Sequence, residues 1–195
     1  QAQKQNKIAA LIGLEGGHQV ENRLDYLDSL YTRGTRYITL TWNNSNEWAT
    51  SAYDSKRKPA FKGMGLSQSG KKAVQHMNDI GMLVDVSHVN EKTFWDVMAV
   101  TTKPIIASHS SVYTLCPVPR NLKDDQIKAI AKNKGVVQVN FNSGFLDSTV
   151  SKREDAFFEL HQSEYDSLQR ATRNEYIAEE MIHAKYRSES DQLRA

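Results

Sequence analysis

Cysteine, strong net charge and long apolar runs are all missing or scarce in this sequence. Its 195 residues include one cysteine, Cys116, so no intrachain disulfide can form, and any metal ion must be held by histidines and carboxylates. No apolar run approaches the roughly 18 residues of a transmembrane helix, and no signal peptide is recognisable. The formal net charge of +2 does not indicate a nucleic-acid partner. These absences leave a soluble globular domain as the expected class.

Glycine and proline are both absent from residue 151 onward, and charged residues are frequent there. We expect residues 151–195 to form one or two long, exposed helices, a charged excursion of the same domain as residues 1–150. A helix that binds a partner is the alternative interpretation of this segment.

Two Ser-His dipeptides organise the middle of the chain. The apolar runs 82–86 and 104–107 each lead into one of them, which places His88 and His109 at matching strand ends. Between them, Asn90 can cap a helix. Parallel strands joined by such a helix lie side by side, so both imidazoles should meet at one edge of a sheet. Two neutral imidazoles there would suit zinc, although polar residues ending buried strands would give the same pattern.

A carboxylate follows the first apolar run in the same way. Residues 8–14 lead into Glu15 and two glycines, so Glu15 occupies the same kind of position as the two histidines. Taken alone, Glu15 would be interpreted as an exposed loop acid. Five strands are expected, at 8–14, 36–41, 82–86, 104–107 and 136–141. Helices are expected at 21–33, 68–80, 90–100 and 124–133, with Ser67 and Asp124 as caps and a polar loop over 45–62.

The alternation of strands and helices predicts an α/β fold with a parallel sheet. A (β/α)₈ barrel of the TIM type usually needs about 250 residues, so this sequence supplies about five of the eight units. An open, doubly wound sheet is the competing architecture. Because the sequence starts at Gln1 without a Met, we expect an excerpt of a longer polypeptide, which would supply the remaining barrel segments.

Five motifs carry a family resemblance. They are Glu15-Gly-Gly, Tyr37-Ile-Thr-Leu-Thr, Gly81-Met-Leu-Val-Asp-Val-Ser-His, Ile106-Ala-Ser-His-Ser and Arg120-Asn-Leu-Lys-Asp. In this order and with compatible spacing, they closely resemble the membrane (renal) dipeptidase family of metallopeptidases. The resemblance covers Ile12 to about Phe141.

The resemblance implies a (β/α)₈ metal-dependent hydrolase of the amidohydrolase-like type with two zinc ions. Glu15 matches the carboxylate that bridges the ions, and His88 and His109 match the ligands of the second ion. The implied substrate is a dipeptide, with tolerance of D-residues at its C-terminal position, attacked by a hydroxide that bridges both ions. A homodimer is possible, and the family favours an extracytoplasmic location.

Two family features have no counterpart in the sequence, and one is altered. The His-x-Asp pair that holds the first ion and the late catalytic aspartate are both absent, in agreement with the incomplete strand count. Trp42 stands where many members have a histidine thought to polarise the substrate carbonyl. An indole N–H can donate a hydrogen bond but carries no charge, so either the catalytic role of Trp42 is weaker or Trp42 is an apolar wall.

Arg120 follows Pro117 and Pro119 in the loop after the His109 strand, and the two prolines restrict the backbone there. We predict that its guanidinium binds the free carboxylate of the substrate through two parallel hydrogen bonds, as the family's Arg-Asn-Leu motif suggests. A surface ion pair is the alternative.

Hydrolysis of dipeptides is therefore the leading hypothesis. A related binuclear metal hydrolase that acts on another small amide, lactam or ester is the second. A metal-free binding protein on a barrel scaffold is the third, since barrels host many functions.

Overall fold

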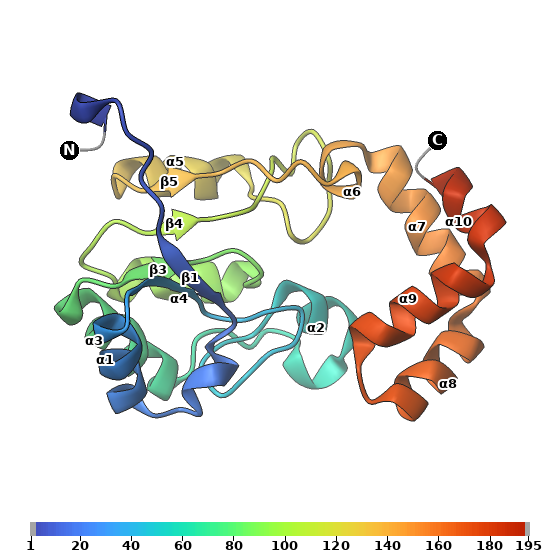
Figure 1. Ribbon diagram of the computed structural model, residues 1–195, viewed down its shortest axis with the longest axis horizontal. Helices are drawn as coiled ribbons and strands as arrows, with labels where there is room; N and C mark the ends of the chain where they lie inside the picture. The colour runs from blue at the N-terminus through green and yellow to red at the C-terminus, as the bar shows by residue number, and fades with distance from the viewer. Residues whose placement is uncertain (1–2, 194–195) are drawn as a thin grey trace. The chain divides into compact units, whose positions relative to one another are not determined.

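A computed structural model describes residues 3–193 of the chain (Figure 1). By their contacts, the described residues group into two compact units. The first runs up to Thr114 and includes Pro119–Asn140, and the second comprises Leu115–Val118 and the chain from Phe141 onward. The expected boundary between residues 150 and 151 lies inside helix α7 (Ser148–Leu160), and the continuous part of the second unit begins at Phe141. Each unit is described by itself below.

The first unit is built on a parallel sheet whose strands follow the chain order. The strands are β1 (Ile12–Glu15), β2 (Thr35–Thr39), β3 (Leu83–Asp85), β4 (Ile106–Ala107) and β5 (Val136–Val137). Within the described residues each strand pairs with its successor, and every pair is parallel. A doubly wound sheet reverses its order at a switch point, whereas a barrel does not. The predicted α/β fold of the barrel type is therefore confirmed over the strands that the chain contains.

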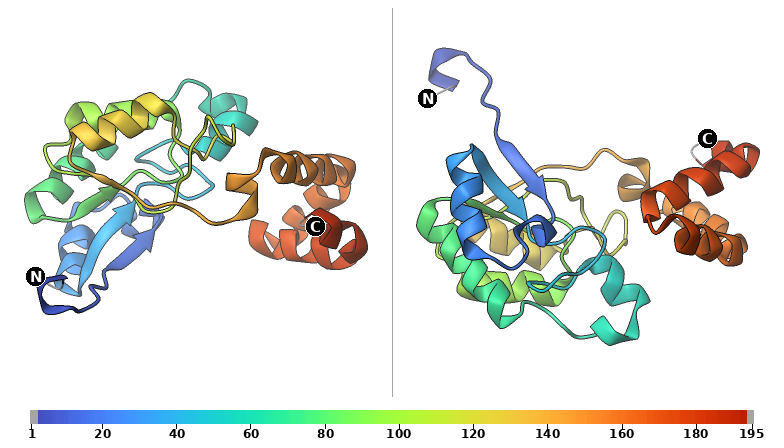
Figure 2. Two further views of the ribbon diagram at one scale, coloured as in Figure 1. Left: turned by 90° about the horizontal axis from the view of Figure 1, so that it is seen from above. Right: turned by 60° about the horizontal axis from the view of Figure 1, so that its bottom comes forward.

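Helices connect the strands and cover the sheet (Figure 2). The helices of this unit are α1 (Leu24–Thr32), α2 (Ala52–Arg57), α3 (Gln68–Ile80), α4 (Glu91–Val100) and α5 (Asp124–Lys132). Helix α1 packs against α3, and α3 packs against α4, so these connecting helices form one layer. The buried core lies between this layer and the sheet, with Leu27, Met77, Val84 and Phe94 among its members.

Local capping explains where two of these helices begin. Ser67 Oγ accepts a hydrogen bond from the Gly70 N–H at the start of α3, and Asn90 Oδ1 accepts one from the Thr93 N–H at the start of α4. Both caps were predicted from the sequence, because a short polar side chain before an apolar helical pattern is a local signal. Gly81 ends α3 at φ 80°, a conformation in which glycine is unstrained.

Two local predictions were wrong. The segment 45–62 is not a plain loop, because it contains α2 and a short 3₁₀ helix, Pro59–Phe61. The N-cap residue of helix α5 is Lys123, whose backbone N–H donates a hydrogen bond to Gln126 Oε1 at 2.9 Å, and Asp124 is the first helical residue.

The second unit is helical and has a core of its own. Phe157, Tyr165, Ala178, Ile182 and Leu193 are its buried apolar residues. Its helices are α6 (Ser143–Leu146), α7, α8 (Gln162–Thr172), α9 (Glu175–Lys185) and α10 (Arg187–Leu193). No helix within residues 3–193 is both long and apolar enough to cross a membrane.

The expectation of one or two long helices from residue 151 onward was wrong. The helices are shorter because polar residues interrupt them without any glycine or proline. Arg173 takes a left-handed conformation at φ 53° and ends α8, and the Asn174 side chain then caps α9 by accepting a hydrogen bond from the Ile177 N–H.

Candidate metal centre

Three side chains from separate strand ends converge at the carboxyl edge of the sheet. Glu15 is the last residue of β1, and His88 and His109 follow β3 and β4. Glu15 Oε1 lies 2.7 Å from His88 Nε2 and 3.0 Å from His109 Nε2, and the two Nε2 atoms are 2.9 Å apart. Among the described residues, Glu15, His88 and His109 form one group whose ligand atoms all lie within 4.8 Å of one another, which is close enough to hold a metal ion. The structure thus brings together the three residues that the sequence places at strand ends.

The electrostatics of these groups fit a metal ion. Burial lowers the pKa of His88 to about 4, against the opposing effect of its hydrogen bond to Glu15. The neighbouring imidazoles of His109 and His88 hold the pKa of Glu15 well below its usual range. At neutral pH the site therefore offers an ionised carboxylate and a neutral His88 ring, the forms that bind metals. Imidazole nitrogens with a carboxylate oxygen form a donor set for a divalent transition-metal ion.

The backbone of His88 is strained, and its side chain is buried. His88 has φ 68°, in the left-handed region, and its carbonyl accepts a hydrogen bond from the Ala52 N–H at 2.8 Å. Only 7% of the residue is exposed. A non-glycine residue in this region costs on the order of 1–3 kcal/mol, and such residues cluster at functional sites. The surrounding fold therefore holds this imidazole at the sheet edge against an intrinsic preference of the chain.

Trp42 lies beside the same histidine. Its ring centroid is 6.5 Å from that of His88, at an interplanar angle of 35°. The side chain is partly buried, so it borders the three converging groups on one side. The structure thus places Trp42 next to the site, and its role there stays a prediction.

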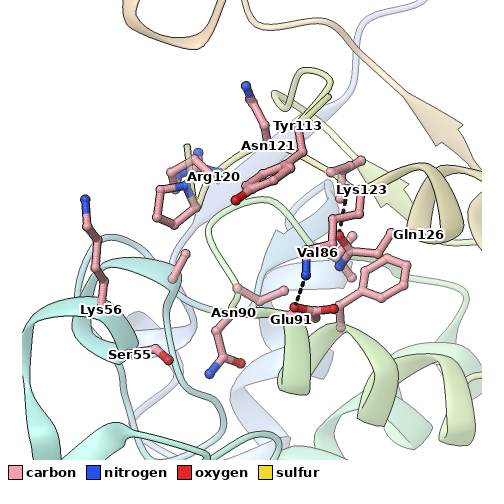
Figure 3. Close-up of a pocket in the computed structure, with 15 residues that line it drawn as sticks. Ser55, Lys56, Val86, Asn90, Glu91, Tyr113, Arg120, Asn121, Lys123 and Gln126 are labelled. Atoms are coloured by element: carbon pink, nitrogen blue, oxygen red, sulfur yellow. Dashed lines mark hydrogen bonds and ion pairs between the residues drawn. The ribbon is translucent and has the colours of Figure 1, made fainter. Parts of the chain in front are cut away.

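A pocket of about 260 Å³ includes Arg120 in its lining. Figure 3 shows Arg120 and Tyr113 on one wall of this pocket and Asn90 and Glu91 on the other. Burial lowers the pKa of Arg120 to about 10, while Asp85 and Glu15 act to raise it, so the guanidinium is charged at neutral pH. The pocket is slightly smaller than the roughly 300–1,000 Å³ of typical ligand sites, so it has room for a small molecule.

Sequence reasoning missed two contributors to this region. Helix α2 brings Ser55 and Lys56 to the pocket from a segment that was expected to be a loop. Asp85, inside one of the quoted motifs, received no role, yet its buried carboxylate accepts hydrogen bonds from residues of three strand ends. An aspartate in the last position of a buried apolar strand was the signal available for it.

Known proteins resemble this chain in sequence and in fold. The profile of the family described as membrane dipeptidase (peptidase family M19) matches residues 1–186. An uncharacterized dipeptidase of Schizosaccharomyces pombe is 45% identical over 147 residues, which cover 75% of this chain and 35% of that protein. An uncharacterized protein of Acinetobacter calcoaceticus is 35% identical over 156 residues, which cover 80% of this chain and 50% of that protein. The chain thus spans about a third to a half of the length of these relatives.

Solved structures with the same fold carry related descriptions. The probable dipeptidase PvdM of Pseudomonas aeruginosa has a TM-score of 0.70 and 26% identity, with 97% of this chain and 50% of that chain covered. A metallopeptidase of Rhodobacter sphaeroides, liganded with a phosphinate mimic of the dipeptide L-Ala-D-Ala, has a TM-score of 0.65 and 28% identity, with 71% of this chain and 39% of that chain covered.

Proposed function

The chain belongs to the membrane dipeptidase family of metallopeptidases, and on that premise we propose that the complete protein is a zinc-dependent dipeptidase. It hydrolyses the peptide bond of dipeptides that have a free C-terminal carboxylate. The observation that carries the proposal is the convergence of Glu15 Oε1, His88 Nε2 and His109 Nε2 within hydrogen-bond distance of one another.

These three residues have separate roles in the proposal. His88 and His109 would hold one zinc ion, and the Glu15 carboxylate would be a ligand shared with a second ion. When bound, divalent zinc supplies Lewis acidity and lowers the pKa of water toward neutrality. The strained, buried backbone of His88 keeps its ligand atom in place. The neutral state of the His88 ring at physiological pH keeps its lone pair available.

The proposal assigns substrate recognition to the pocket whose lining includes Val89 and Asn90, the two residues directly after His88. Arg120 pairs with the C-terminal carboxylate of the dipeptide and orients it, while Trp42 forms an apolar wall next to His88. Recognition of that carboxylate limits the substrate to two residues, because a longer peptide would carry its terminus beyond Arg120. Acceptance of a D-residue at the C-terminal position is supported by the similarity to the Rhodobacter metallopeptidase, whose ligand mimics L-Ala-D-Ala.

A substrate panel with the complete protein tests this function. We expect zinc-dependent hydrolysis of L-Ala-L-Ala and L-Ala-D-Ala, loss of activity with a chelator and recovery when zinc is restored. N-acetylalanine and the C-terminal amide of Ala-Ala should be poor substrates. Hydrolysis of N-acylated amino acids in preference to dipeptides would instead indicate a related hydrolase of small amides.

A pair of histidine variants provides the control for the metal site. His109→Gln should lose zinc from the purified protein and lose hydrolysis with it. His76→Gln changes a histidine of α3 that pairs with Asp28, away from the site, and should retain both. Equal zinc content and activity in the two variants would contradict the assigned role of His109.

A further inference from the structure

The buried carboxylate of Asp85 accepts four hydrogen bonds at the carboxyl end of the sheet. Its Oδ1 accepts from the backbone N–H groups of Ser87 and Ser108, at 2.9 and 3.0 Å. Its Oδ2 accepts from Thr39 Oγ1 at 2.6 Å and from Ser108 Oγ at 2.5 Å. Asp85 is fully buried, and its register pairs it with Thr39 of β2 and Ile106 of β4. This one carboxylate therefore joins the ends of three adjacent strands.

The hydroxyl of Ser108 also contacts the ring of His109, with 2.7 Å between Oγ and Nδ1. A serine hydroxyl has a single proton to donate. Because that proton is directed at Asp85, Ser108 Oγ acts as the acceptor toward the ring, and His109 Nδ1 must be the donor. A neutral imidazole with its proton on Nδ1 carries its lone pair on Nε2. That Nε2 is the atom that faces Glu15 Oε1 at 3.0 Å.

We propose that Asp85 is a positioning residue that acts through Ser108 to hold His109 in the Nδ1–H tautomer, so that the Nε2 lone pair is presented to a metal ion. The inference rests on the proposed function, in which His109 is a metal ligand. Histidine ligands commonly donate their other N–H to a carboxylate or carbonyl, which sets ring orientation and tautomer. Here a serine hydroxyl stands between the ring and the carboxylate.

The neighbouring histidine shows that this arrangement is specific to one ligand. His88 Nδ1 is buried and has no hydrogen-bond partner in the part of the chain that the structure describes. For His109, by contrast, the backbone is held as well, since its N–H donates to Ser87 Oγ at 3.0 Å. Without a metal ion, Glu15 favours a proton on the Nε2 that faces it. The tautomer of His109 in the metal-free protein therefore measures the effect of Asp85 against that opposing preference.

Asp85→Asn is the decisive variant because it preserves shape and reverses one set of hydrogen bonds. The amide oxygen must face the two backbone N–H groups, which cannot reorient, so the NH₂ group faces Thr39 and Ser108. The Ser108 hydroxyl then accepts from the amide and turns its own proton toward His109 Nδ1. The ring proton moves to Nε2, the atom that should bind the metal.

Two readouts on the complete protein follow this change. Long-range ¹⁵N–¹H correlation spectra of histidine-labelled, metal-free protein report the tautomer of His109, recorded at a pH where the ring is neutral. Competition with a chelating indicator reports zinc affinity. We expect the Nδ1–H tautomer in the wild type, the Nε2–H tautomer in Asp85→Asn, and a zinc affinity lowered about ten- to a hundredfold in the variant.

Two further variants complete the design. Thr39→Val removes a hydrogen bond to the same Oδ2 but leaves Ser108 in place, so both tautomer and affinity should stay close to wild type. Ser108→Ala removes the acceptor for Nδ1, so both tautomers should appear and the affinity should fall less than in Asp85→Asn. If Asp85→Asn does not fold, Ser108→Ala decides the question.

The proposal is overturned if the wild type shows the Nε2–H tautomer, or if folded Asp85→Asn or Ser108→Ala keeps a single Nδ1–H tautomer. Equal zinc affinity in Asp85→Asn and Thr39→Val would also overturn it. The tautomer is measured without metal or substrate, so it decides the role of Asp85 even for a protein that fails the dipeptide assay. Failure of wild-type zinc binding or hydrolysis counts against the proposed function instead.

Discussion

At the scale of single residues, Arg120 provides positive charge next to the acidic groups of the metal centre. Its charge acts on Glu15, Asp85 and His88, which places the guanidinium within electrostatic reach of the converging side chains. A planar guanidinium binds a carboxylate through two parallel hydrogen bonds, which gives orientation as well as attraction. This chemistry explains why we assign the substrate's terminal carboxylate to this residue.

Arg120→Ala in the complete protein should lower kcat/KM for a dipeptide about ten- to a hundredfold, because a charge-assisted contact contributes roughly 1.5–3 kcal/mol. Zinc content should not change. The measurement compares a dipeptide with its C-terminal amide: the wild type should prefer the free acid strongly, and the variant should not. Arg57→Ala is the matched control, since Arg57 lies on α2 over the ring of Tyr53 and does not line the pocket. Equal discrimination by wild type and Arg120→Ala would remove Arg120 from substrate recognition.

At the scale of elements, α2 shapes one side of the pocket, and short-range polar contacts hold it there. Ser51 Oγ caps the helix by accepting a hydrogen bond from the Asp54 N–H at 3.0 Å. The buried carboxylate of Asp54 accepts from the Ser45 N–H at 2.6 Å and pairs with Lys58 at 2.7 Å. These bonds turn the chain back on itself, so Ser55 reaches the pocket lining.

Asp54→Asn should lower the free energy of unfolding at pH 7 by about 1–2 kcal/mol, because the charge in these contacts is lost. Burial acts to raise the pKa of Asp54, but Lys58 and Ser45 outweigh it and hold the pKa below its usual value. A depressed carboxyl pKa gives stability that is present above the unfolded value, about 3.9, and is lost as the pH falls through the folded value. Denaturant unfolding curves of wild type and variant should therefore converge at acidic pH below about 4.

Asp79→Asn serves as the comparison for this experiment. Asp79 is an exposed aspartate of α3, and its replacement should leave stability within about 0.5 kcal/mol of wild type at either pH. A stability difference between Asp54→Asn and wild type that stays constant down to pH 2 would contradict the electrostatic account of α2.

At the scale of the whole molecule, the sheet has two apolar edges within the described residues. The strands β1 and β5 each pair on one side alone, and Ile12 and Val136 on them are 59% and 54% exposed. In a (β/α)₈ barrel, further strands pair with such edges and close the sheet. Exposed apolar edge strands otherwise promote association between chains.

A polypeptide limited to residues 1–195 is therefore expected to self-associate and to lack hydrolytic activity. Size-exclusion chromatography with light scattering should show oligomers or aggregates, and Ile12→Lys with Val136→Lys should reduce them, because edge charges oppose strand pairing. A monomeric, cooperatively melting and active protein from these residues would contradict this expectation. The same measurement on the complete protein tests the homodimer, which stays a prediction.

The sequence alone determined the features that depend on a few neighbouring residues. Alternation of apolar runs with helical patterns predicted five parallel strands, and the repeated Ser-His dipeptide placed His88 and His109 at equivalent strand ends. The caps at Ser67 and Asn90 were predicted for the same reason, since a cap bonds to an N–H group within the next turn. The sequential strand order follows from local connections that a barrel repeats.

Only the tertiary structure decided the features that depend on contacts between distant segments. The bond between Asp85 and Thr39 joins residues 46 positions apart, and its existence depends on the register of two strands. Helix α2 forms where a loop was expected because its first turn is tied to distant backbone groups: the Asp54 carboxylate accepts from the Ser45 N–H, and the Ala52 N–H donates to the carbonyl of His88. Hydrogen bonds of this kind are chosen by the packed fold, since composition and periodicity carry no information about which distant donor meets which acceptor.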